Sequence, residues 1–157
     1  MKNLPLLNVN GMIGRGAYEE AEFPTAASLV EHLDYLAIER SLVWHVAARD
    51  LSPPLGNRLL LTHLTASGLT HRLIPGFIVT PACFFEYGVL DLLRGHLASG
   101  AVRALRITPE VSRFSVREIE RVLHELASYE PALFWDCGNF GTEAALRDFE
   151  FLAGAFP

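Results

Sequence analysis

The feature of this chain that most constrains its fold is a regular alternation of short apolar runs with longer amphipathic stretches. The alternation recurs roughly every 30 residues, which is the length of a βαβ unit. The runs Leu42-Val43-Trp44 and Phe77-Ile78-Val79 are continuously apolar, as is typical of parallel strands that are buried on both faces. The pattern predicts five parallel strands, at residues 4–9, 41–46, 73–79, 102–107 and 132–135.

Helices are predicted between the strands from their capping residues and apolar stripes. The clearest one begins at Ser115, which is expected to form a capping box with Glu118. Thr25 and Thr142 are expected to cap two others, and a further helix is expected to begin near Asn57. In the last helix the stripe predicted to face the core consists of Ala145, Leu146, Phe149, Leu152 and Ala153.

Composition narrows the classes of protein that fit. The 157 residues, of which 50% are apolar and 20% charged, suit a single domain with a sizeable core. The net charge of -5 comes without a basic stripe, which argues against a nucleic-acid partner. No apolar run reaches the roughly 18 residues of a membrane span, so no membrane partner is expected. Cys83 and Cys137 make neither a disulfide framework nor a zinc motif, which favours a cytoplasmic location.

Two parallel architectures fit five βα units. One is a compact doubly wound sheet, for which about 150 residues is a natural size. The other is a (β/α)8 barrel, which needs about 250 residues, so that this chain would supply only part of it. Length alone favours the doubly wound sheet.

Three segments favour the barrel. Leu6-Leu7-Asn8-Val9-Asn10-Gly11-Met12-Ile13-Gly14 resembles the first strand of the amidohydrolase superfamily, the amidohydrolase-related metal-dependent hydrolases. Gly100-Ala101-Val102-Arg103-Ala104-Leu105-Arg106 resembles the fourth strand of that family, and Pro131-Ala132-Leu133-Phe134 resembles the fifth. The resemblance implies an α/β fold in which residues 1–157 form one amidohydrolase-like domain, a partial TIM barrel. It would have about five of the eight βα units and would be incomplete at its C-terminus.

The family's metal-binding motif is altered in this chain. In the family the first strand carries an acidic residue and then His-x-His, which binds a divalent metal. Here the acidic position is Asn8, and the two histidine positions are Asn10 and Met12. The fifth-strand ligand position falls near Trp135 or Asp136. The family implies a divalent metal, but its ligands are missing, so no metal ligand is predicted and the cofactor is left open.

Polar residues at the predicted strand ends are the candidates for a site, because the carboxyl ends of parallel strands meet on one rim. His45 or Asp136 is expected to act as the catalytic acid or base. The substrate would be held by Asn8, Asn10, Arg49 and Arg106. Other roles remain open: a turn at the asparagines, a structural His45, an ion pair between Arg106 and a carboxylate such as Glu110, and loop capping by Asp136.

Two functions of different classes follow. The first is a hydrolase or lyase of the amidohydrolase-like type, acting on a small polar substrate without the usual metal motif. The alternative is a non-catalytic binding or scaffold relative. Because an open barrel leaves two strand edges uncovered, association with another chain, including a second copy of this one, is a further expectation.

Overall fold

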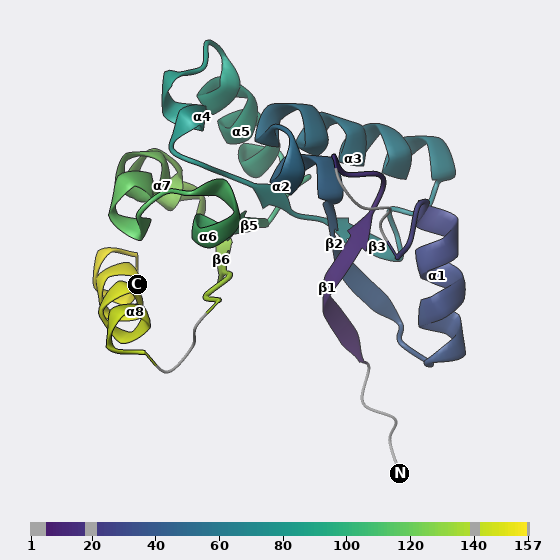
Figure 1. Cartoon of the computed structure of the whole chain (residues 1–157). Coiled ribbons are helices and arrows are strands. Elements are labelled where there is room, and N and C mark those ends of the chain that lie inside the picture. The colour runs from purple at the N-terminus through teal and green to yellow at the C-terminus, as the bar shows by residue number, and fades with distance from the viewer. Residues whose placement is uncertain (1–5, 18–21, 139–141, 157) are drawn as a thin grey trace. The chain divides into compact units, whose positions relative to one another are not determined.

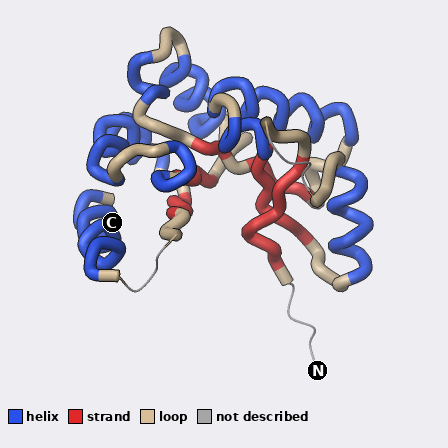
Figure 2. The backbone as a smooth tube through the Cα atoms, viewed as in Figure 1, coloured by secondary structure: helices blue, strands red, loops and turns tan. Residues whose placement is uncertain are grey.

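A computed structural model describes residues 6–17, 22–138 and 142–156 (Figure 1). The chain divides into two compact units, Met1–Phe77 and Ile78–Pro157. Each unit combines a small parallel sheet with helices, and strands alternate with helices along the chain (Figure 2). The parallel α/β class predicted from the sequence is therefore confirmed, whereas the described strands form two sheets and no closed barrel.

The sheet of the first unit contains β1 (Leu7–Ile13), β2 (Arg40–His45) and β3 (Leu73–Pro75). The strands are parallel and lie in the order β1-β2-β3. The central strand β2 is buried from its second residue to its last, as its continuous apolar sequence predicts. In this sheet the strands therefore follow chain order, and β1 is not the central strand.

The helices of the first unit are α1 (Ala26–Tyr35), α2 (Val46–Asp50) and α3 (Pro53–Ser67). The Thr25 hydroxyl accepts from the Ser28 N–H at 3.1 Å, which confirms the predicted cap. The short α2 was not predicted, and α3 begins well before Asn57 because Pro53 suits the first helical turn. Contacts of α1 with β1, of α3 with β2 and β3, and between the two helices place α1 and α3 on the same face of the sheet.

Gly76 divides the predicted strand 73–79 into two parts. The first part, β3, pairs with β2, and the second part, β4 (Phe77–Ile78), belongs to the other sheet. The Gly76 N–H donates to the Val43 carbonyl at 2.9 Å. A Cβ at this position would overlap the Trp44 ring, so the strand can pass the indole only where it has no side chain.

The sheet of the second unit has the order β4-β5-β6, with β5 (Ala104–Ile107) and β6 (Ala132–Trp135) parallel. Its α-helices are α4 (Ala82–Phe85), α5 (Val89–Ala98), α6 (Pro109–Ser112), α7 (Glu120–Leu126) and α8 (Glu143–Ala155). Two 3-10 turns, η1 (Val116–Ile119) and η2 (Ala127–Tyr129), flank α7.

Two helix predictions in the second unit have opposite outcomes. The capping box of Ser115 and Glu118 is confirmed, although the first turn after it is 3-10 rather than α-helical. The predicted core face of α8 is wrong, because Leu146 and Phe149 are 52% and 55% exposed and Leu152 alone of the predicted stripe is buried. Relative to the prediction, the helix is rotated about its axis. Its buried and half-buried side includes Ala145, Asp148, Phe151, Leu152 and Ala155.

Within the ranges described, no helix has the length and apolar character needed to cross a membrane.

Candidate functional site

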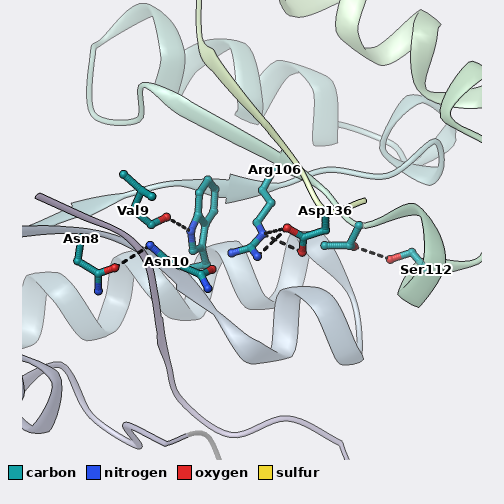
Figure 3. Close-up of polar contacts among 8 residues, drawn as sticks. Asn8, Val9, Asn10, Arg106, Ser112 and Asp136 are labelled. Atoms are coloured by element: carbon teal, nitrogen blue, oxygen red, sulfur yellow. Dashed lines mark hydrogen bonds and ion pairs between the residues drawn. The ribbon is translucent and has the colours of Figure 1, made fainter. Parts of the chain in front are cut away.

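Asn8 and Asn10 lie inside β1 and not at its end, which corrects the predicted strand boundary. The strand continues to Ile13, and its pairing with β2 shifts register between Asn8 and Gly11. The Asn8 Oδ1 accepts from the Asn10 N–H at 2.9 Å (Figure 3). This bond gives the Asn10 N–H a partner at the point where the register shifts, as an asparagine side chain does in a turn. Residues 4 and 5 of the predicted strand lie outside the described residues.

His45 is the last residue of β2 and is 2% exposed. Its Nδ1 accepts from the Ala47 N–H at 3.1 Å and so caps α2. An Nδ1 that accepts carries no proton, so the neutral ring holds its proton on Nε2. Nε2 is buried and has no hydrogen-bond partner within the part of the chain that the structure describes.

The surroundings of His45 keep its ring neutral. Burial, and secondly the nearby His63, lower the pKa of His45 from 6.5 to about 4. The two ring centroids are 5.2 Å apart. Because His63 lies on α3, the His45 ring faces the helix layer, and Trp44 points to the opposite face of β2. The arrangement suits a structural cap for α2, and the predicted role of His45 in acid–base chemistry stays a prediction.

Two glycines that follow β1, Gly14 and Gly16, lie close to α2 and to His45. A Cβ on Gly14, whose φ is +90°, would overlap the His45 ring at its Nε2 edge. A Cβ on Gly16 would overlap the Asp50 carboxylate. Asp50 also accepts from the Arg49 Nε at 2.6 Å. Arg49, predicted to hold substrate, is thus engaged with its neighbour in the chain.

Arg106 and Asp136 come together at the carboxyl ends of β5 and β6 (Figure 3). The Arg106 Nε donates to both carboxylate oxygens, at 2.9 and 3.0 Å, and Nη2 lies 2.7 Å from Oδ1. The Arg106 side chain is 13% exposed and that of Asp136 is 36% exposed. Parallel pairing of the two strands therefore brings these two predicted site residues into contact. Glu110 was the other carboxylate considered as a partner for Arg106. Its carboxylate lies against Gly138, at the place where a Cβ of that residue would be.

A cavity of about 340 Å³ adjoins this pair. Asp136 lies on its wall together with Trp135 at the end of β6. The other wall comes from α6 and α8, which contribute the carboxylates of Glu110 and Asp148. The cavity thus has a largely apolar surface with carboxylates on both walls, one of them the oriented Asp136, and it lies at the strand ends where parallel α/β sheets bind ligands.

The ion pair predicts a measurable energetic coupling. In a double-mutant cycle of Arg106→Ala and Asp136→Ala, followed by urea unfolding, we expect the two residues to be coupled by about 1 kcal/mol. The value is modest because Asp136 is partly exposed and water screens the pair. A cycle of Arg94→Ala and Asp91→Ala, an exposed pair on α5, serves as the control and should give less. Equal coupling in the two cycles would contradict a specially oriented Arg106.

The residues present do not fit the divalent metal of the amidohydrolase family. The two histidine positions are an amide and a thioether, which are poor zinc ligands. In the described ranges, no three His, Cys, Asp or Glu side chains gather in a way that could hold a metal ion. No catalytic step is therefore assigned to a metal.

The predicted site residues are divided between the two units. Asn8, Asn10, His45 and Arg49 belong to the first, and Arg106 and Asp136 to the second. Sequence reasoning missed the contact of His63 with His45 and the contribution of Asp148 to the cavity. The signal for Asp148 in the sequence is its place on the helix that the Thr142 cap begins, α8.

Comparison of the chain with family models finds no match, and comparisons with curated proteins and with solved structures find no significant match.

Proposed function

We propose that this chain is a divergent relative of the amidohydrolase-like (β/α) barrels and corresponds to about five of their eight βα units. The order of strands supports the proposal, since both sheets follow the order of the chain. The helices support it as well, because α1 and α3 contact each other on one face of the first sheet. A doubly wound sheet would instead place β1 between its neighbours and carry helices on both faces.

The proposed activity is that of a hydrolase or lyase acting on a small polar substrate at the ends of β5 and β6. The observation that carries it is Asp136, which is paired with Arg106 and lies on the wall of a cavity of about 340 Å³. This volume lies at the lower end of the roughly 300–1,000 Å³ that is common for small-molecule sites. A substrate bound there would meet an oriented carboxylate.

In this proposal Asp136 is the catalytic carboxylate. For hydrolysis it takes a proton from a water molecule whose oxygen attacks the substrate's carbonyl carbon, and it later passes that proton to the leaving group. Arg106 is a positioning residue, because its Nε contacts both oxygens of the carboxylate and limits rotation of Asp136. Trp135 and the α8 residues of the wall would shield the reacting atoms from bulk water.

The second candidate is a binding relative without catalysis. The observation that favours it is the pairing of Arg106 with Asp136, because each group already neutralises the other. In that case the pair holds the two strand ends together, and the cavity binds a ligand without chemical change. The two candidates differ in whether Asp136 is needed for turnover.

Turnover of simple probes by the full chain tests the activity. We would follow p-nitrophenyl acetate for hydrolysis and oxaloacetate for carbon–carbon cleavage, at pH 7. We expect Asp136→Asn to lower kcat/KM by about 100-fold or more, the usual contribution of a general base. The control, Asp91→Asn, removes an exposed carboxylate of α5 and should leave the rate unchanged. Unchanged turnover in Asp136→Asn would overturn the role of that residue, and no turnover by the wild type would favour the binding relative.

A further inference from the structure

We propose that the second unit holds another small-molecule site, a cavity walled mainly by apolar side chains that takes a ligand with an apolar body and a positively charged end. The cavity has a volume of about 620 Å³ and is lined by residues of β5, β6, α7, η2 and the end of α8. It lies near the amino ends of the strands, because Glu130 and Pro131, which line it, directly precede β6. The proposal is independent of the activity at Asp136.

Among the described residues, the side chains that line the cavity are apolar apart from that of Glu130. Leu105 and Leu123 are 0% and 4% exposed and form its deepest part. Leu133, Ala155 and Phe156 are half-buried and form its walls. Such side chains favour an aliphatic or aromatic group on the ligand, because removing its apolar surface from water stabilises the complex.

The volume of the cavity, about 620 Å³, suits a small organic ligand. The cavity opens to solvent at Ala127 and Glu130, which are both exposed. Its wall combines the small side chain of Ala155, at the end of α8, with Leu133 of β6.

Charge decides which end of a ligand lies at the rim. Glu130 is exposed, and it is the one charged residue in the described lining. A carboxylate beside an apolar opening attracts an ammonium group and disfavours a carboxylate on the ligand. We expect the discrimination to be about fivefold in Kd, as is usual for one exposed ion pair.

The cavity is separate from the site at Asp136. Leu105 and Leu133 line it, and the residues that follow them in the strands, Arg106 and Phe134, point to the opposite face of the sheet. A ligand in this cavity would therefore not contact the Arg106 guanidinium. Its binding is expected to survive Asp136→Asn, which distinguishes this proposal from the proposed activity.

A matched series of probes tests the site in the full chain. Tryptamine, indole and indole-3-acetate share one ring system and differ in charge, and their Kd values are measured by titration calorimetry. We expect tryptamine to bind about fivefold more tightly than indole-3-acetate, with indole between them. Absence of binding by all three would overturn the proposal, and equal Kd values would overturn the role of Glu130.

Substitutions in the lining test whether the probes bind in this cavity. Ala155→Phe fills the wall and should weaken all three probes at least tenfold, with folding checked by circular dichroism. If that variant does not fold, Ala127→Phe, at the exposed rim, takes its place. Glu130→Gln keeps the shape and should abolish only the preference for tryptamine. Unchanged binding in the folded filling variant would show that the probes bind elsewhere and would overturn the site.

Discussion

Replacing Gly14 by alanine is expected to destabilise the protein by about 3 kcal/mol, of which overlap with the His45 ring supplies the larger part. The φ of Gly14 is +90°, so any side chain there is strained by about 1 kcal/mol. The new Cβ would also overlap Nε2, Cε1 and Cδ2 of His45. The ring cannot move away without losing its bond to the Ala47 N–H. Urea unfolding at pH 7 measures the loss.

Gly68 provides a matched control for this substitution. Its φ is +67°, and nothing lies within 4 Å of a Cβ built there. Gly68→Ala should therefore cost only the conformational part, about 1 kcal/mol. In a His45→Ala background the cost of Gly14→Ala should fall to a similar value, because the overlapping ring is gone. Equal costs for Gly14→Ala with and without the ring would contradict the packing of the β1–α1 loop on His45.

Local signals predicted some elements closely. The strand at 132–135 has the bounds found in the structure, and the capping box of Ser115 and Glu118 is present. The signals for these features lie within a few residues of one another, so a short stretch of sequence is enough to predict them. The contact of Arg106 with Asp136 was predictable for a different reason. Parallel pairing of neighbouring βα units brings their carboxyl ends together whatever the sequence separation.

Other features depend on packing between distant segments. Asn8 and Asn10 were expected at a strand end, where an asparagine pair before Gly11 is typical of a turn. In the structure Gly11 lets β1 approach Ser41 and Leu29, so the strand continues past it. The orientation of α8 was missed since its apolar residues cover well over half of the helix circumference, and periodicity alone does not select which part of that broad side is buried. The contact of His63 with His45 arises only when α3 packs on β2.

Acidification is expected to destabilise the protein through His45 by about 3 kcal/mol between pH 6.5 and pH 4. The pKa of His45 is about 4 in the folded protein and about 6.5 in the unfolded chain. Between these values the unfolded chain binds a proton that the folded protein does not bind. The contribution of His45 to the free energy of unfolding is therefore constant above pH 6.5. It falls as the pH falls from 6.5 toward 4, and it does not fall further below pH 4.

The structure explains why the pKa of His45 is low in the folded protein. A proton on Nδ1 would face the Ala47 N–H and break the cap of α2. The charged ring would also be buried at 2% exposure, and His63 on α3 would repel it whenever His63 is itself protonated. Protonation is thus expected to loosen the junction of β2 with α2 first, before the rest of the first unit.

Comparison with a variant that lacks the titrating ring isolates the contribution of His45, since carboxylates elsewhere also respond to acid. In His45→Asn the side-chain Oδ1 takes the place of Nδ1 and can accept from the Ala47 N–H, yet the residue does not titrate. Urea unfolding at pH 7.5, 5.5 and 4 should show a smaller loss in His45→Asn than in the wild type, by about 3 kcal/mol at the lowest pH. His71→Asn, which removes an exposed histidine, should lose as much as the wild type. If His45→Asn and the wild type lose the same stability, the buried neutral ring is not the origin of the acid sensitivity.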